Sequence, residues 1–379
     1  ATAFPARPAS PPRWCGRSTS SVNYVLRRLA ATLPVMGVVA VVVFLLIHLS
    51  PGDPAGIGPE IVAKALAHDA ILRGRVVVVG DPLPMRDALT RYAPRFRLRE
   101  VDLRDSDALP DDLQEHEIAI HPVPCLSALP EAGKVGADAG RAAYQAIVAA
   151  ATLSMDGHTC GMATAPISKL ALRAAGVSEP GHTEILAHIA GRSGDDQFAM
   201  MFASERLQVV LATIHLPLAD ALKALTPELV LAKLQLTHDA GCWLGKASPL
   251  IAVAGINPHA GEAGMLGDDE SRVLLPAIAQ ARALGLRVTD PLPPDTVFMR
   301  ARTGEFDVVL AMYHDQGLIP VKLLGLDAAV NVTIGLPFLR SSVDHGTAFD
   351  IAGRGVASEA NLLHVLRWHL ARIDAASQP

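Results

Sequence analysis

Three histidines stand directly after three different apolar runs of this sequence, and together they could bind a metal ion. The runs before His215, His259 and His314 are rich in Val, Leu, Ile and Ala. Such runs are typical of buried strands in a parallel sheet, and open α/β sheets bind ligands at the carboxyl ends of their strands. Neutral imidazoles suit Zn²⁺ or Co²⁺ better than Mg²⁺. We therefore predict one divalent-metal site assembled from distant parts of the chain.

Each histidine also has an ordinary structural explanation. A single histidine at a strand end is more often a core or capping residue than a metal ligand. Three of them, with Asn257 and Asp315 close by in the sequence, favour a shared site. Asp315 is a candidate base, or a carboxylate that orients a metal-bound imidazole. For Asp295, in a Pro-rich loop, capping of a turn is an equal alternative.

Several cations lie close to predicted strand ends and Gly-rich loops. Lys169, Lys322 and Arg340, with Thr183 and Asn331 as hydrogen-bond partners, fit a phosphate or a carboxylate. A solvated surface charge is the commoner fate of a lysine, so this alternative stays open. Arg340 is the strongest candidate because it closes an apolar strand.

A Gly-rich turn at 52–60 opens the first helix of the regular α/β pattern. Gly56 and Gly58 precede an amphipathic segment from Ile61 to His68. Free N–H groups at the start of a helix can bind an anion or the edge of a ribose. A Gly-rich turn alone is a weak signal, so a plain tight turn is the alternative.

The composition favours a large α/β protein that positions these residues. The chain has 379 residues, of which 50% are hydrophobic and 4% aromatic, which allows more than one domain. Its net charge of -5 gives no reason to expect nucleic-acid binding. The four cysteines form no CxxC pair, so a structural zinc or disulfide framework is not expected and a reducing cytoplasm is the default.

The first fifty residues do not follow the α/β pattern. Residues 1–20 are rich in Pro, Ser and Arg, which predicts disorder. Residues 21–50 contain an uncharged run long enough for a transmembrane helix, and preceding arginines would keep the N-terminus cytoplasmic. Residues 22–55 resemble the first transmembrane helix of dipeptide/oligopeptide ABC-transporter permeases. The alternative is that Val38 to Leu49 forms the first buried strand of the domain. The two interpretations are compatible, since the last part could pair in the sheet while the rest protrudes.

Seven motifs resemble the PdxA family, the NAD-dependent 4-hydroxythreonine-4-phosphate dehydrogenases. The resemblance runs from Gly52 to about Ala357, and the motifs in this order are highly specific. They are Gly52-Asp53-Pro54-Ala55-Gly56-Ile57-Gly58-Pro59-Glu60, Thr164-Ala165-Pro166-Ile167, Pro180-Gly181-His182-Thr183-Glu184, Asn257-Pro258-His259-Ala260-Gly261-Glu262, Pro293-Pro294-Asp295-Thr296, Met312-Tyr313-His314-Asp315-Gln316-Gly317 and Ser342-Val343-Asp344-His345-Gly346-Thr347-Ala348.

The resemblance implies an isocitrate/isopropylmalate-dehydrogenase-like fold with two interleaved α/β domains around a central cleft. It also implies a homodimer with its active site at the subunit interface, where both subunits supply metal ligands. Asp315 and Lys322 are the implied catalytic candidates, and a metal-bound water is another candidate proton acceptor. The implied sites comprise His215, His259 and His314 for the metal; His182, Thr183, Lys322, Asn331 and Arg340 for the phosphorylated substrate; and Gly56, Gly58, His345, Gly346, Thr347, Ala348 and Asp350 for NAD.

The implied reaction is oxidation and decarboxylation of 4-phosphohydroxy-L-threonine to 3-amino-2-oxopropyl phosphate, a step of pyridoxal 5'-phosphate biosynthesis. A metal lowers the pKa of the substrate hydroxyl, hydride passes to NAD⁺, and the resulting β-keto acid loses CO₂. Residues 318–322 and 133–135 look closer to a branch of the family that acts on D-threonate or D-erythronate 4-phosphate. No single residue decides between these substrates by its chemistry.

One departure from the family concerns the first strand. The family usually opens with a strand that runs into Thr-Met-Gly-Asp-Pro, whereas Ile47-His48-Leu49-Ser50-Pro51 precedes Gly52 here. We hypothesise that a permease-like sequence replaces this strand, through recombination or an assembly fault. The main prediction is a cytoplasmic NAD- and metal-dependent dehydrogenase that touches a membrane only through residues 21–50. An inactive, membrane-anchored fusion product is the competing hypothesis.

Overall fold

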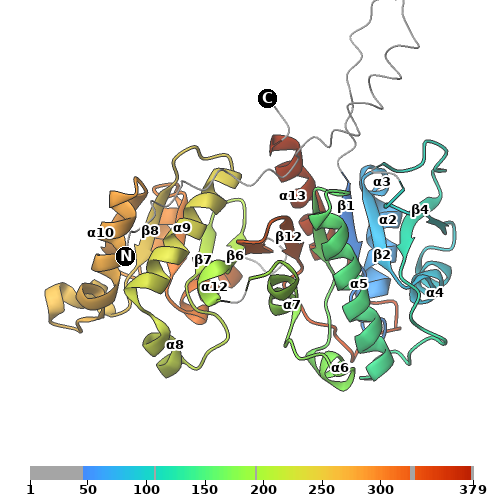
Figure 1. The fold of residues 1–379 in the computed structure, drawn as a ribbon, viewed down its shortest axis with the longest axis horizontal. Coiled ribbons are helices and arrows are strands. Elements are labelled where there is room, and N and C mark those ends of the chain that lie inside the picture. Colours follow the sequence, from blue (N-terminus) through green and yellow to red (C-terminus); the bar gives the residue numbers. More distant parts are fainter. Residues whose placement is uncertain (1–45, 106–107, 193, 325–328, 377–379) are drawn as a thin grey trace, which may run out of the picture.

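A single mixed sheet runs through the whole protein. The computed structural model describes residues 46–105, 108–192, 194–324 and 329–376. Within them, twelve strands are ordered β3-β4-β2-β1-β5-β12-β11-β6-β7-β10-β8-β9. Helices cover this sheet in two halves, with β12 and α13 between them (Figure 1).

The half drawn mainly in blue and green has a parallel sheet (Figure 1). Its Val-rich strand β2 is completely buried, as expected for a strand that helices cover on both faces, which is why its run is continuously apolar. Its elements are β1 (Ile47–Ser50), β2 (Val76–Gly80), β3 (Arg97–Glu100), β4 (Glu117–Pro122), β5 (Gly161–Thr164), α2 (Gly58–His68), α3 (Ala70–Arg73), α4 (Pro82–Tyr92), α5 (Ala137–Met155), α6 (Lys169–Ala174) and α7 (His182–Ile189).

The half drawn mainly in yellow and orange has parallel strands β7, β10, β8 and β9, with antiparallel β6 on its inner side (Figure 1). Its elements are β6 (Ala199–Ala203), β7 (Gln208–Leu211), β8 (Leu250–Ala254), β9 (Arg287–Leu292), β10 (Val308–Ala311), α8 (Leu218–Ala224), α9 (Pro227–Trp243), α10 (Leu275–Ala283), α11 (Val297–Arg302) and α12 (His314–Leu323).

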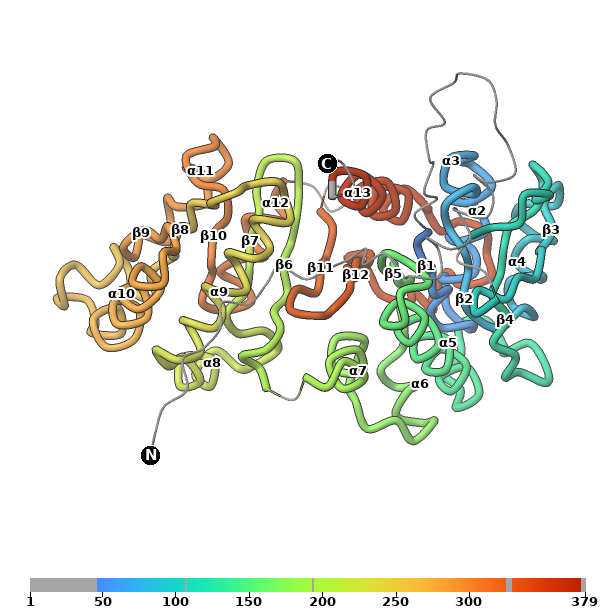
Figure 2. The backbone as a smooth tube through the Cα atoms, turned by 45° about the horizontal axis from the view of Figure 1, so that its top comes forward, coloured from blue at the N-terminus to red at the C-terminus, as the bar shows by residue number. Residues whose placement is uncertain are grey.

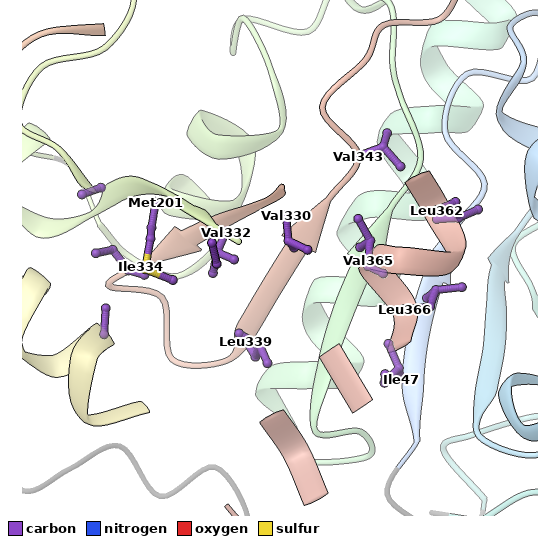
Figure 3. Close-up of a cluster of buried hydrophobic side chains, with 14 of the residues drawn as sticks. Ile47, Met201, Val330, Val332, Ile334, Leu339, Val343, Leu362, Val365 and Leu366 are labelled. Atoms are coloured by element: carbon purple, nitrogen blue, oxygen red, sulfur yellow. The ribbon is translucent and has the colours of Figure 1, made fainter. Parts of the chain in front are cut away.

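Two late strands and the last helix join the halves. β11 (Val330–Ile334) pairs with β6 and with β12 (Leu339–Ser342), and β12 pairs with β5. The apolar core is continuous across this junction, from β1 through α13 (Ala360–Ala376) to β11 and β6 (Figure 3). The predicted α/β fold is therefore confirmed.

The end of the N-terminal apolar segment lies inside this fold. Ile47–Ser50 form β1, between β2 and β5, and all four residues are buried. Among the residues that the structure describes, none of the helices is long and apolar enough to cross a membrane. The expected disorder of 1–20, and the permease-like part before residue 46, lie outside the described residues.

A histidine stands where a strand core normally holds an aliphatic side chain. His48 is fully buried in β1, and its Nδ1 donates to the carbonyl of Ala150 at 3.1 Å. Its Nε2 has no hydrogen-bond partner within residues 46–376 as far as the structure describes them. His369 of α13 is equally buried and binds Ser341 on β12 through Nδ1 at 2.7 Å. Burial lowers the pKa of each of these two imidazoles to about 3.

We therefore expect acid to destabilise the protein well before most carboxylates titrate. In the unfolded chain each histidine binds a proton near its ordinary pKa of 6.5, whereas the folded chain resists protonation until about pH 3. The stability that these groups contribute is present above pH 6.5 and declines as the pH falls toward 3, by up to about 1.4 kcal/mol per pH unit for each histidine. Denaturant unfolding of His48→Gln across this range should show a shallower decline than the unchanged chain. The exposed His116→Gln is the control, and an unchanged slope for His48→Gln would contradict the assignment.

Candidate active site

Two of the three predicted metal ligands lie together at the carboxyl ends of neighbouring strands. His215 follows β7 and His314 follows β10, which are paired in parallel. Their ring centroids are 5.6 Å apart with an angle of 45° between the rings. Two imidazoles on one tetrahedral metal have centroids roughly 5 Å apart. The sheet thus brings together two side chains that are distant in sequence, at a spacing that fits a shared ion.

Neighbouring groups orient the ring of His314 and lower the pKa of His215. Nδ1 of His314 lies 2.7 Å from a carboxylate oxygen of Asp315, which leaves Nε2 as the nitrogen free to bind a metal. The pKa of His215 is lowered, first by the crowding that buries part of its ring and then by the positive charges of Lys169 and His314. Part of the His215 side chain remains exposed to solvent, so its burial is only partial. A lowered pKa keeps this imidazole neutral, the form that binds metals.

His259 is held separately, in an unusual backbone conformation. From His259 to Ala263 five consecutive residues have left-handed φ values between 44° and 80°, and four of them are not glycine. Each such residue costs about 1–2 kcal/mol relative to a right-handed one. The buried carboxylate of Glu270 offsets this cost by accepting the N–H groups of Ile256 at 2.8 Å and Asn257 at 2.7 Å. The turn therefore holds His259 in an exposed position.

The predicted trio is not assembled within one chain. Among the described residues, no three His, Cys, Asp or Glu side chains are grouped closely enough to hold a metal ion. The structure brings His215 and His314 together and leaves His259 apart from any such group.

Arg340 is a buried cation without a counter-ion. Only 3% of this residue on β12 is exposed. Nη1 donates to the hydroxyl of Thr333 at 3.0 Å, and Nη2 donates to the hydroxyl of Thr164 at 2.8 Å. Burial lowers the pKa of the guanidinium to about 10, opposed by the negative charge of Glu184. Both of these partners are uncharged, and within the described part of the chain Arg340 forms no ion pair, so a bound anion would supply the missing charge.

Unsatisfied polar atoms surround Arg340. Nε of Arg340, Nε2 of His182 and Oδ1 of Asn331 are shielded from solvent and find no hydrogen-bond partner in the part of the chain that the structure describes. His182 begins α7, and its pKa is lowered by burial and by the positive charge of Arg340, which shows that the two lie close together. Asn331 is two residues from Thr333 on β11, so its side chain shares a sheet face with Arg340. Buried Thr183 follows His182 in the first turn of α7.

Lys322 reaches across the junction between the halves. Its Nζ lies 3.4 Å from a carboxylate oxygen of Asp344, just before the predicted cofactor loop. Lys322 comes from the last turn of α12, which begins with His314, so one helix carries both a predicted metal ligand and this cation. The side chain is 44% exposed.

The Gly-rich turn packs directly on the predicted cofactor loop. The N–H of Ile57 donates to the carbonyl of Thr347 at 3.1 Å. A Cβ on Gly56 would lie 3.0 Å from Cβ of Thr347, and a Cβ on Gly58 would lie 2.0 Å from the carbonyl oxygen of Pro51. Glycine is therefore required at both positions by close approach. Around them His345, Gly346 and Asp350 are exposed, and Ala348 has a φ of 42°.

Some residues of this site were not predicted from the sequence. Thr164 and Thr333 fix Arg340, and Asp53 keeps one carboxylate oxygen without a partner while burial raises its pKa. Glu270 shapes the turn that carries His259. Position was the available signal for Thr164, which ends β5 at the edge where ligands bind.

The chain is similar to proteins of one enzyme family over most of its length. The family model described as pyridoxal phosphate biosynthetic protein PdxA matches residues 73–368. The chain is 49% identical over 311 residues to a 4-hydroxythreonine-4-phosphate dehydrogenase of Beijerinckia indica subsp. indica, with 82% of this chain and 90% of that protein covered. It is 42% identical over 336 residues to a D-threonate 4-phosphate dehydrogenase of Cupriavidus necator, with 85% and 95% covered.

The fold of this chain is also similar to that of a solved structure from the same group of enzymes. The crystal structure of 4-hydroxythreonine-4-phosphate dehydrogenase from Klebsiella pneumoniae superimposes with a TM-score of 0.79 at 41% identity. The alignment covers 86% of this chain and 99% of that one. The agreement therefore includes both halves of the sheet.

Proposed function

Because the chain belongs to the PdxA family, whose model it matches over residues 73–368, we propose that it oxidises and decarboxylates 4-phosphohydroxy-L-threonine with NAD⁺ and a divalent metal. Its close relatives are dehydrogenases, and a dehydrogenase of this family uses a nicotinamide cofactor. The observation that carries the proposal is a pair of imidazoles, His215 and His314, on the same edge of the sheet as a buried guanidinium without a counter-ion. This is the arrangement that a phosphorylated hydroxy acid needs.

Arg340 is the proposed phosphate grip. Its unbonded Nε, with Nε2 of His182 and Oδ1 of Asn331, supplies polar atoms that a phosphorylated substrate can satisfy. Thr164 and Thr333 fix the plane of the guanidinium before substrate arrives, so little orientation entropy is lost on binding. Binding energy from the phosphate then positions the reacting carbon. Lys322 and Thr183 complete the proposed substrate set.

His215 and His314 are the proposed metal ligands from this chain, with Zn²⁺, Co²⁺ or Mg²⁺ as candidates. When bound, the metal supplies Lewis-acid polarisation of the substrate hydroxyl, and the nicotinamide supplies the hydride acceptor. Asp315 holds the tautomer of His314 through Nδ1 and is the proposed residue that takes the hydroxyl proton. The exposure of Asp315, at 73%, lets it pass a proton on to solvent.

We assign the third ligand to His259 of a second copy of this chain, in a homodimer. Two observations support this: His259 is exposed on a rigid left-handed turn, and the next residues along the chain expose large apolar side chains. Met265 is 82% exposed and Leu266 is 44% exposed. Exposed apolar residues beside a functional side chain are typical of an interface.

The Gly-rich turn and the loop that packs on it are the proposed NAD site. Gly56 and Gly58 open α2, whose first N–H groups can bind the cofactor phosphates. His345, Gly346, Thr347, Ala348 and Asp350 lie in the loop that touches this turn through Thr347. The two α/β parts of the region 51–379 would then bring cofactor and substrate together.

A second candidate substrate is D-threonate 4-phosphate, because a D-threonate 4-phosphate dehydrogenase is 42% identical over 95% of its length. A turnover screen separates the candidates through formation of NADH. We expect kcat/KM for 4-phosphohydroxy-L-threonine to exceed that for D-threonate and D-erythronate 4-phosphate by at least about tenfold. Omitting the phosphate group from the substrate should lower kcat/KM by at least about 10³-fold, because every contact to the phosphate is then lost. Preference for a sugar-acid phosphate would establish the second candidate, and absence of NADH with all three would overturn both.

A further inference from the structure

A cavity lies on the side of the sheet opposite to the proposed active site. It has a volume of about 330 Å³ and is lined by residues at the start of β7 and β10, including Gln208 and Val308, and by one face of α13. Figure 1 shows α13 on the upper side of the junction, and α7 and α8, which adjoin His182 and His215, on the lower side. The cavity is therefore separate from the site already described.

Three of the side chains that line this cavity carry unsatisfied polar atoms. Nε2 of His364, Nε of Arg372 and Oε1 of Gln208 are shielded from solvent and have no hydrogen-bond partner among the described residues. The described residues contain twelve such atoms, and three of them line this one cavity. Another three belong to the proposed phosphate grip, so the same signature marks both places. Leaving a buried donor such as Nε of Arg372 unpaired is costly, which favours a ligand with acceptor oxygens.

The charges that line the cavity favour an anion. Arg206 and Arg372 form no ion pair with the described residues, whereas Lys246 is paired with Asp307 at 3.1 Å. Glu205 also lines the cavity and, like Arg206, is exposed to solvent, whereas Arg372 is half-buried. Two unpaired guanidinium groups against one exposed carboxylate leave a positive cavity. Guanidinium groups bind carboxylates and phosphates through parallel hydrogen bonds.

An aromatic ring adds a planar wall. His364, Trp368 and Arg372 are four residues apart along α13, so they lie on one face of that helix. The guanidinium of Arg372 lies 5.9 Å from the centre of the Trp368 ring, which also lines the cavity. The volume is at the lower end of the range for small-molecule sites. We propose that this cavity binds a small organic anion whose carboxylate or phosphoryl group pairs with Arg372 and whose planar body packs on Trp368.

Such a ligand would hold the two halves together. α13 is fixed to the first half by the ion pairs Arg75–Asp374 at 2.6 Å and Arg367–Asp69 at 2.8 Å. The opposite wall comes from the second half, where β7 and β10 start at the cavity and end just before His215 and His314. Figure 2 shows α13 alongside β12 at this junction. Occupancy therefore stabilises the folded protein by tying α13 to both strands.

Titration calorimetry with phenyl phosphate and with benzoate tests the proposal on the full chain. The Arg340→Met background removes the proposed phosphate grip, so binding there reports the cavity and needs no turnover. We expect saturable binding of at least one probe, weakened at least about tenfold by Arg372→Met. Arg367→Gln, on the exposed face of the same helix, is the matched control and should leave binding unchanged.

A second substitution in the cavity lining tests the proposal independently. Arg206→Gln removes the second unpaired guanidinium of the lining and should weaken probe binding even if Arg372→Met does not fold. Absence of saturable binding by both probes in the Arg340→Met background, or equal binding with and without Arg372, would overturn the proposal. Neither outcome would affect the proposed dehydrogenase activity, which the turnover screen tests separately.

Discussion

Arg340→Met is expected to lower kcat/KM for the phosphorylated substrate by about 10²- to 10³-fold, the equivalent of roughly 3–4 kcal/mol of lost transition-state binding. The guanidinium is 3% exposed and faces no carboxylate within ion-pair distance among the described residues. Its removal therefore takes away the charge that a phosphate needs. The hydrogen bonds to Thr333 and Thr164, which hold the plane of the guanidinium, are lost at the same time.

The stability of this variant distinguishes a functional arginine from a structural one. Methionine leaves the hydroxyls of Thr164 and Thr333 without their donor, but it also removes the cost of burying an uncompensated cation. We expect the free energy of unfolding without substrate to change by no more than about 1 kcal/mol. Steady-state kinetics and denaturant unfolding measure the two effects. A fall in stability that accounts for the lost activity would show that Arg340 is structural.

Arg340→Lys is the conservative comparison. It keeps the positive charge but cannot donate to both threonines and to a phosphate in one plane. We expect activity between that of the unchanged enzyme and that of Arg340→Met, mainly through a raised KM. Arg367→Gln, at an exposed ion pair on α13, should leave both constants unchanged.

His314→Ala and His215→Ala are each expected to lower metal-dependent turnover by at least about 10³-fold, and the double variant should be little worse than either single one. Residues that bind one ion act as a unit, so their losses do not add. Both side chains lie at the surface of the chain, with His314 34% exposed, so neither change should impair folding. Turnover with added Zn²⁺, Co²⁺ or Mg²⁺ and the bound-metal content measure the effect. Additive losses, or full metal content in both single variants, would contradict the assignment of both histidines to one ion.

Mixed dimers test the origin of the third ligand. His259→Ala should be as inactive as His314→Ala when each is assayed alone. If His259 acts in the partner's site, subunits of the two variants mixed at random should form one intact site in each mixed dimer. About one quarter of the unchanged activity should then return. Failure of the mixture to regain activity would argue that all three ligands act within one chain, and unchanged turnover in His259→Ala would exclude it from the metal site.

Local sequence patterns predict the main strands and the edge of the sheet at which the candidate site lies. Apolar runs at Val76–Gly80 and Val308–Ala311 are strands because continuous β-branched and aliphatic residues suit a sheet covered on both faces. His215 and His314 could be placed at strand ends for the same local reason. The amphipathic segment after Gly58 and the close approach that this glycine permits follow from its neighbours along the chain.

The tertiary structure alone decided which of these residues meet. Arg340 binds Thr164, 176 positions away, because β12 lies beside β5, and no local pattern encodes that strand order. Lys322 faces Asp344, and His259 stands apart from the imidazole pair, because long-range packing sets where α12 and the left-handed turn point. The cavity beneath α13 likewise exists only where two halves of one sheet are brought together. Secondary structure follows from short-range sterics and periodicity, whereas these contacts depend on the cooperative closure of long loops around a common core.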